Sequence, residues 1–461
     1  MIGYKKIFTG RRSRGSGEER ERDMPLFDRK KLTALIWPLL VEQLLSVLVG
    51  MADVLMVAFL GEAAISGVSL VDALNNLFMQ VLFALSAGGT VVCAQLIGAG
   101  DTRRASRAGG QLYFITVTVM TAVTVLFLLG GRRLLSLIYG QAEAAVLDAA
   151  AIYFRITALS FPLLAVYNSG IAIFRAQGNT KLSMTVSLRM NILNVIGNAF
   201  CIFVLKMGVA GVAIPTVLAR GYAAAVITHR IQRPENPLRL HSLADVKPEG
   251  ELLRRVLSIG LPNGMESGLF RLGTVLLQSL VSTLGTASIA AYAVANNLAT
   301  YLYLPGNAVG AAMITVVGQC YGAKEYGQAK RYTKLLVGLD YAIAGAIAAV
   351  LIVGSRFWVG LYQLTGESAS LARGLIVAHS LAMVIWPTAF MFAYYFRAIG
   401  KAAFTMWVAV SAMWIFRIGF AYLFIRVLGM SVLGVWYAMF IDWAFRTFIY
   451  LTKFPKSLPD T

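Results

Sequence analysis

The chain has 461 residues, of which 58% are hydrophobic and only 14% are charged, and its formal net charge is +19. A soluble globular protein has roughly 45–50% apolar and about 25% charged residues, so this composition excludes a soluble enzyme, a disordered protein and a disulfide scaffold. A basic, very apolar chain is typical of a membrane protein whose cations lie mostly on one side.

Apolar spans alternate with polar segments along the whole chain. A basic tail at 1–31 lacks the apolar stretch of a signal peptide. Six spans follow, at roughly 32–58, 65–97, 112–130, 152–174, 183–205 and 209–229. After a polar linker at 230–251 come six more, at roughly 255–283, 287–318, 333–354, 374–396, 402–425 and 431–452, and then a polar tail at 454–461. A transmembrane helix needs about 20 apolar residues. The sequence therefore predicts an all-α polytopic membrane protein with twelve transmembrane helices, in bundles at 32–229 and 252–453.

The distribution of Lys and Arg predicts the orientation of these spans. With an even number of spans, both termini lie on one side of the membrane. The segments on that side hold 29 of the 41 Lys and Arg residues, the segments on the other side hold 6, and the spans hold 6. Because cytoplasmic loops carry the excess of Lys and Arg, we expect both termini in the cytoplasm, with the chain in the plasma (inner) membrane.

The two halves of the chain are related by an internal repeat. A shift of 224 positions aligns residues 38–107 with 262–331 without a gap and with 18 identities. They include Glu42/Glu266, Gln95/Gln319 and Gly98/Gly322, and the segment FRAQG at 174–178 recurs as FRAIG at 396–400. Each half begins and ends inside, so the pseudo-two-fold axis is predicted to run along the membrane normal. Transporters built this way bind substrate between the halves and move the halves to alternate access.

Acidic residues inside the spans are the first functional candidates, because an ionisable group in the bilayer is costly. The spans also contain six arginines, which are Arg155, Arg189, Arg220, Arg271, Arg417 and Arg446. The acids are Glu42, Asp53, Asp72, Glu266, Asp340 and Asp442. Ion pairing is expected for Asp442, which lies four residues before Arg446. Asp340 is expected near a helix end.

Asp53 is the strongest of these candidates. It lies deep in the first span, in GMADVLMVAFLG, with no basic residue nearby in sequence. A carboxyl group in a low dielectric can bind and release protons near neutral pH. Glu42 precedes it by eleven residues, which places both within about 20° of one helix face. We therefore expect both acids to face the same cavity.

Polar and aromatic residues in other spans each allow two interpretations. Asn194 and Asn198, one helical turn apart, and Thr216 offer neutral oxygens for a hard cation, or they form ordinary interhelical hydrogen bonds. Glu42 and Glu266 each follow a proline by four residues. They either line a cavity for cationic substrates or are structural, capping freed backbone or pairing with Arg271.

The tenth span is dense in aromatic residues and methionine. These side chains suit a promiscuous pocket for flat cations, or they face lipid. The residues concerned are Phe390, Met391, Tyr394 and Tyr395. The sequence contains no phosphate-binding loop, Cys/His metal set or nucleophile elbow, so we expect neither an enzyme nor a cofactor.

Taken together, these motifs resemble the multidrug and toxic compound extrusion (MATE) family. The resemblance covers roughly residues 30–452, through the two six-helix halves, the ADVLMVAFLG segment after Pro38, the Q-x-x-G motifs, FRAQGNTK and GVAGVAIPT. It implies a V-shaped twelve-helix antiporter that exports cationic amphiphiles in exchange for H+ or Na+. The implied partners are small organic cations, the coupling ion and membrane lipid, without nucleic acid, and we expect a monomer.

The resemblance also implies roles for single residues. The family's first-helix aspartate, 15 residues after a proline, corresponds to Asp53, and Na+ is the only metal ion expected there. The family's fifth-helix Asn and Asp correspond to Asn194 and Asn198, so the second acid is absent. The sixth-helix Thr corresponds to Thr216 and a fourth-helix Asn to Asn168. The seventh-helix Glu of one branch corresponds to Phe270. A lipid-linked oligosaccharide flippase of the same superfamily is the alternative, on the strength of Arg220, Arg271 and Arg417.

Overall fold

The structure is a computed structural model that describes residues 25–140, 142–240 and 246–459. Within these ranges it contains helices and no strand. The N-terminal bundle consists of α2 (Arg29–Ala58), α3 (Glu62–Gly98), α4 (Thr102–Tyr139), α5 (Ala144–Ala158), α6 (Phe161–Ala176), α7 (Thr180–Ala199), the π-helix η1 (Phe200–Val204) and α8 (Ala210–Gln232).

The C-terminal bundle repeats this order. It consists of α9 (Gly250–Ser282), α10 (Thr286–Gly322), α11 (Tyr326–Val353), α12 (Ser355–Gly360), α13 (Gly366–Ala382), α14 (Trp386–Ala398), α15 (Ala402–Ser411), η3 (Ala412–Gly419), α16 (Phe420–Tyr422), η4 (Leu423–Val427) and α17 (Leu433–Lys453). The helices at both bundle boundaries extend slightly beyond the expected spans.

The twelve predicted spans correspond to these helices. Eight helices of the described chain are long and apolar enough to cross a bilayer, and two bent pairs, α5–α6 and α13–α14, bring the number to ten. The other two are α9, with 33 residues, and α17, with 21, each of which carries charged residues within its length. The chain is thus all-helical, with two six-span repeats.

Matching sequence signals interrupt the helices at matching places in the two bundles. Gly61 and Gly285 precede α3 and α10 with φ of 94° and 87°, a conformation that glycine adopts without strain. The bends of 47° and 54° in the two broken spans precede Pro162 and Pro387, each in the first turn of the second helix. These shared breaks show that the repeat extends to local backbone geometry.

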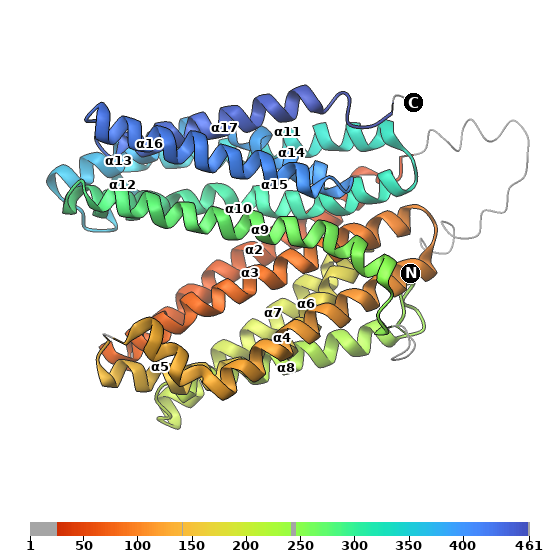
Figure 1. Cartoon of the computed structure of the whole chain (residues 1–461), viewed down its shortest axis with the longest axis horizontal. Coiled ribbons are helices and arrows are strands. Elements are labelled where there is room, and N and C mark those ends of the chain that lie inside the picture. Colours follow the sequence, from red (N-terminus) through yellow and green to blue (C-terminus); the bar gives the residue numbers. More distant parts are fainter. Residues whose placement is uncertain (1–24, 141, 241–245, 460–461) are drawn as a thin grey trace, which may run out of the picture.

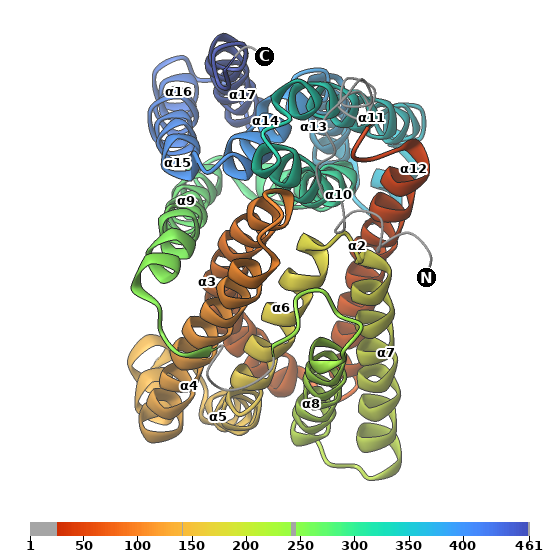
Figure 2. The same cartoon turned by 90° about the vertical axis from the view of Figure 1, so that its right-hand side faces the viewer.

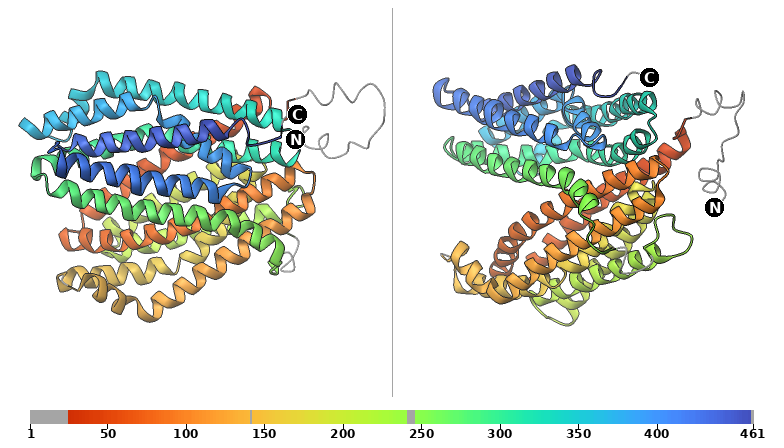
Figure 3. Two further views of the ribbon diagram at one scale, coloured as in Figure 1. Left: turned by 45° about the horizontal axis from the view of Figure 1, so that its top comes forward. Right: turned by 45° about the vertical axis from the view of Figure 1, so that its right-hand side comes forward.

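The two bundles form a V (Figure 1). They converge at the end of the molecule where the described chain begins and finishes, which we call the closed end, and they diverge toward the other end (Figure 3). The start of α2 packs on the C-terminal bundle, since Leu32, Leu35 and Leu39 belong to a buried cluster with residues of α10, α11 and α14. In these views, the two bundles are therefore in contact at the closed end and separate at the other end.

The closed end is held by a crossing of α3 and α10. A β-carbon at Gly98 would overlap the backbone carbonyl of Gln319, and one at Gly322 would overlap that of Gln95, so only glycine fits at either position. The side-chain amide of Gln95 donates to the carbonyl of Ala398 at 2.8 Å, and that of Gln319 donates to Ala176 at 2.7 Å. The repeated Q-x-x-G and FRA motifs are thus the two halves of one reciprocal contact.

We predict that G98A and G322A weaken this crossing. Overpacking destabilises the closed arrangement by about 1–3 kcal/mol, which should speed any reaction that requires opening by roughly 5- to 150-fold. The fully buried thiols of Cys93 and Cys320, next to the crossing residues, report the opening. Maleimide labelling of these thiols, in a C201S background, is expected to accelerate in both variants.

Gly130 provides the control, since a β-carbon there would contact nothing within 4 Å. G130A should label at the rate of the unmodified chain. Equal labelling rates for G98A and G130A would contradict the role of the crossing.

Candidate functional site

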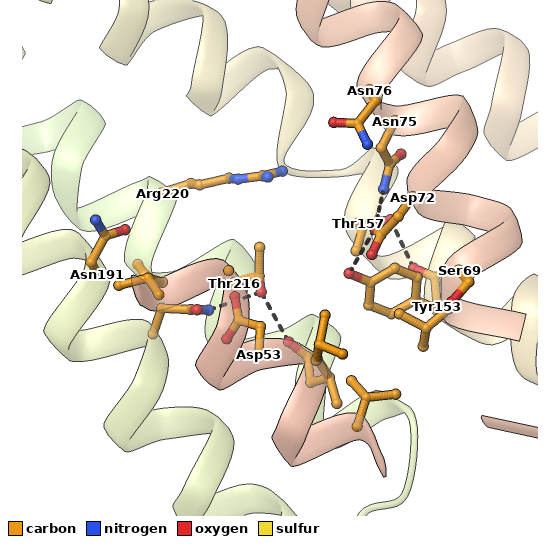
Figure 4. A pocket seen from close by; sticks show the side chains of 18 of the residues that line it. Asp53, Ser69, Asp72, Asn75, Asn76, Tyr153, Thr157, Asn191, Thr216 and Arg220 are labelled. Carbon is orange, nitrogen blue, oxygen red and sulfur yellow. Dashed lines mark hydrogen bonds between the residues drawn. The ribbon is translucent and has the colours of Figure 1, made fainter. Parts of the chain in front are cut away.

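A polar cavity of about 420 Å³ lies within the N-terminal bundle. Helices α2, α3, α5, α7 and α8 contribute side chains to it, and Figure 4 shows the polar ones pointing toward one another. Its charged residues are Asp53, Asp72 and Arg220. Polar groups that converge in a membrane-embedded cavity are a default functional site.

The structure brings together four of the five residues that the sequence assigned to ion coupling. Asp53 of α2 is half-buried and accepts a hydrogen bond at 3.0 Å from the side-chain amide of Asn198 in α7. One turn earlier, the amide of Asn194 donates to the hydroxyl of Thr216 in α8 at 2.9 Å. The Thr216 hydroxyl in turn donates to the carbonyl of Val212 at 2.9 Å. The fifth, Asn168, donates to Leu164 within α6 and does not line the cavity.

Close packing of α7 on α8 creates this arrangement. A β-carbon at Gly197 would lie 2.7 Å from Cβ of Pro215, so the glycine allows the proline ring to approach α7. This approach places Thr216 beside Asn194. Two residues after Asn198, at Phe200, the π-helix η1 begins, a distortion often found at functional sites.

A second polar group occupies the other side of the cavity, and sequence reasoning did not assign it to the ion site. Asp72 of α3 accepts hydrogen bonds from the Tyr153 hydroxyl at 3.2 Å and from the Asn75 amide at 3.4 Å. Arg220 donates to the Ser160 hydroxyl at 2.6 Å and, among the described residues, forms no ion pair within 4 Å. Figure 4 shows Arg220 extending toward Asp72 and Tyr153.

The charges give the cavity an excess of acid. Two carboxyl groups face a single guanidinium among the residues that line it. Neither Asp53 nor Asp72 is tied to a cation at ion-pair distance within the described chain, so either can exchange a proton without breaking a salt bridge. The apolar part of the wall includes Met79, Met190 and Tyr153, which are adaptable or aromatic surfaces suited to organic ligands.

The two repeat-related glutamates form symmetric ion pairs instead of lining this cavity. Glu42 pairs with Arg175 at 2.9 Å, and Glu266 pairs with Arg397 at 2.7 Å, so Arg271 is not the partner of Glu266. Both arginines come from the repeated FRA segments. The carboxylate of Glu42 is paired with the guanidinium of Arg175, and Glu42 does not line the cavity that contains Asp53.

The backbone carbonyls near Pro38 are satisfied by a different residue. A proline at position 38 has no N–H for the carbonyl four residues earlier, at Ala34. The Thr180 hydroxyl of α7 lies 3.3 Å from that carbonyl and donates to the next, at Leu35, at 2.8 Å. Glu42 is thus a partner of Arg175, not a cap for freed backbone.

Within the described chain, the C-terminal bundle contains two fully buried acids, of which one is paired with arginine. Asp442 is fully buried and pairs with Arg446 at 2.6 Å, as expected from their spacing, and also with Arg417 at 2.8 Å. From the sequence we expected Asp340 near a helix end, and this prediction is wrong. Asp340 lies in the middle of α11. It is fully buried and neither carboxyl oxygen has a hydrogen-bond partner among the described residues.

The aromatic side chains of the tenth span divide between a cavity and the core. Tyr394 lines a cavity of about 240 Å³ between the two bundles, together with Arg397. Phe390 is partly buried and stacks on Trp386 with ring centroids 4.9 Å apart. Met391 and Tyr395, by contrast, are fully buried in the C-terminal bundle, so in this conformation they do not line a substrate cavity.

Comparison with known proteins agrees with this architecture. The MatE family model matches the chain twice, over residues 38–200 and 262–423, at the same 224-residue offset as the internal repeat. The chain is 27% identical over 428 residues to the uncharacterized transporter YisQ of Bacillus subtilis, and the alignment covers 89% of this chain and 90% of that protein. It is 26% identical over 444 residues to the probable multidrug resistance protein NorM of Thermotoga maritima, covering 92% of both.

Solved structures share the fold. One is the outward-facing conformation of a multidrug resistance MATE family transporter of the MOP superfamily, with a TM-score of 0.85, 21% identity, and coverage of 96% of this chain and 98% of that one. Another is a MOP superfamily transporter from Pyrococcus furiosus, with a TM-score of 0.84, 20% identity, and coverage of 96% and 97%.

The Asp442 ion-pair cluster gives a prediction about stability. D442A leaves two buried guanidinium groups without their counterion, which should lower the free energy of unfolding by about 3–5 kcal/mol. D148A removes one partner of an exposed pair with Arg132, which should cost about 0–1 kcal/mol. Thermal unfolding in detergent compares the two variants. Equal unfolding temperatures would contradict the structural role of Asp442.

Proposed function

Because the chain belongs to the MATE family of transporters, we propose that it exports cationic amphiphilic compounds in exchange for protons by alternating access. The observation that carries this proposal is the acidic cavity of the N-terminal bundle, in which the Asp53 carboxylate accepts a hydrogen bond but has no cationic partner at ion-pair distance in the described chain.

The orientation follows from the distribution of charge. Both ends of the described chain lie at the closed end, which Figure 2 views face-on, and this side carries most of the Lys and Arg residues of the described chain. With the closed end in the cytoplasm, the V opens to the outside. The conformation is then the one that releases substrate and accepts the coupling ion.

Two ions, H+ and Na+, suit an isolated carboxyl group, and the local hydrogen bonds favour H+. A hard cation prefers several oxygen ligands with free lone pairs. Asn198 presents its amide N–H, not its oxygen, to Asp53, while the Thr216 oxygen accepts from Asn194 and donates to Val212. Arg220 adds a fixed positive charge to the same cavity. A proton needs only the carboxylate itself.

The transport cycle follows from a change of charge in this cavity. A bound organic cation is stabilised by the two carboxylates and by the aromatic and methionine walls. Protonation of Asp53 from the outside removes one negative charge from the cavity. This loss of charge weakens the binding of the organic cation. The proton and the cation thus compete for the negative charge of this cavity, and each weakens the binding of the other by the same factor. Deprotonation toward the cytoplasm restores the cation-binding state.

The flippase alternative requires several arginines in one cavity to hold a pyrophosphate group. Arg417 is already paired with Asp442 in the C-terminal bundle, and Arg220 is the single basic residue among those that line the acidic cavity. These observations favour cationic substrates instead. A monomeric state and the absence of nucleic acid as a partner stay predictions.

We predict that D53N abolishes proton-driven export. The substitution keeps the shape and the hydrogen bond with Asn198 but removes the titratable group, so it should reduce transport at least about 100-fold, the size expected when a required proton carrier is lost. Ethidium movement in vesicles that contain the purified chain, with pH and Na+ gradients imposed separately, measures this effect.

Asp148, an exposed acid paired with Arg132, supplies the matched control, and D148N should transport like the unmodified chain. Normal export by D53N down a pH gradient would sink the proposal. Export by the unmodified chain that follows only the Na+ gradient would overturn the assignment of the coupling ion.

A further inference from the structure

A large groove lies at the closed end, outside the acidic cavity. It has a volume of about 1570 Å³ and is lined by the first turns of α2 and α7 and by the end of α8 with the residues that follow it. Figure 2 shows these segments beside one another at this end of the molecule. Because these helices begin or end here, the groove lies where transmembrane spans meet the membrane surface.

The charge of the groove is strongly positive. Five basic side chains from three separate segments converge on it, with one carboxylate, Glu235. None of the five forms an ion pair within 4 Å with a carboxylate of the described chain. They are Arg29, Lys30, Lys181, Arg230 and Arg233. Like charges held together on rigid helices repel one another, so the arrangement is stabilised by a bound anion.

The groove continues from this basic rim onto an apolar wall. In α2, Trp37 follows Lys30 by seven residues, which is about 10 Å farther along the helix and away from the closed end. Its side chain is 65% exposed, although it lines the groove. In α7, Met184 follows Lys181 by one turn and lines the same groove. In both helices, a basic residue at the closed end is therefore followed by an apolar residue farther from that end.

We propose that this groove binds an anionic phospholipid. Its headgroup phosphate lies among the basic side chains, and its acyl chain lies along Trp37. A phosphate with an attached hydrocarbon chain satisfies both parts of the groove, whereas a soluble anion satisfies only the rim. Juxtamembrane clusters of Lys and Arg attract anionic lipid by about 1 kcal/mol for each residue.

The position of the groove connects lipid binding with the ion site. Helices α2, α7 and α8, which line the groove together with the end of α6, also carry Asp53, Asn198 and Thr216. A lipid seated between their ends fixes their relative positions. The proposal of lipid binding does not rest on the proposed function, since binding is measured without transport.

Quenching of tryptophan fluorescence by brominated lipid tests the proposal directly. The purified full chain is placed in bilayers of phosphatidylcholine, and brominated phosphatidylglycerol or brominated phosphatidylcholine is added. We expect stronger quenching at lower mole fraction by the anionic lipid. We also expect this difference to disappear in W37F, although six other tryptophans remain. Quenching that is equal for both lipids would overturn the proposal.

Charge variants separate the groove from the rest of the basic surface. R230Q/R233Q should weaken the preference for phosphatidylglycerol about 30-fold, from roughly five-fold for each cation removed. R132Q/R133Q, at the end of α4, removes the same charge at the opposite end of the molecule and should leave the preference unchanged. An equal loss in both double variants would contradict a specific site.

Inorganic phosphate distinguishes the two sources of the anion. At millimolar concentration it should not relieve quenching by brominated phosphatidylglycerol, because it lacks the acyl chain that contacts Trp37. Displacement of the lipid by phosphate at the same affinity would assign the groove to a soluble anion and overturn the lipid assignment.

Discussion

The crossing of α3 and α10 is the contact on which the V-shaped arrangement depends. Gly98 lies against the backbone of Gln319, and Gly322 lies against that of Gln95, so equivalent residues exchange equivalent contacts. Such reciprocity requires a two-fold axis between the two helices. The glutamine amides then bond to the carbonyls of Ala176 and Ala398, which satisfies the ends of α6 and α14. The apolar cluster that the start of α2 forms with α10, α11 and α14 adds to this crossing, so polar and apolar packing together hold the closed end.

Pairing of charge divides most of the acids within the spans into two groups. Glu42, Glu266 and Asp442 each lie within 3 Å of a guanidinium, and breaking such a buried pair is costly. Asp53 and Asp72 instead accept hydrogen bonds from neutral amide and phenol groups. A neutral donor holds a carboxylate in place but releases it on protonation at little cost. The carboxyl groups of the candidate site thus lie where arginines are absent or, as with Arg220, bonded to a hydroxyl.

The fold was largely predictable from sequence, whereas the site was predictable only in part. Span positions, the repeat and the Asp442–Arg446 pair follow from apolar length, self-similarity and helical spacing, which are local or periodic signals. Asp53 could be found because it lacks a nearby cation in sequence. The partners of Glu42 and Glu266 could not, because Arg175 and Arg397 are brought there by the folding of distant spans. Tyr153 was missed for the same reason, since its bond to Asp72 depends on how α5 packs on α3.

The repeat itself explains why the candidate ion site belongs to one bundle. At the same 224-residue offset, Asp53 corresponds to Leu277, which is buried in the apolar core of the C-terminal bundle, and Asp72 corresponds to Asn296. The two bundles thus share a scaffold but not its charge. Helix α2 joins the two functions, because its first turns pack on the C-terminal bundle and its later turns carry Asp53. Between them lies Pro38, where the missing backbone hydrogen bond makes bending easier. In the proposed mechanism, a change of charge at Asp53 acts on one end of this helix, and the other end is part of the contact that closes the molecule.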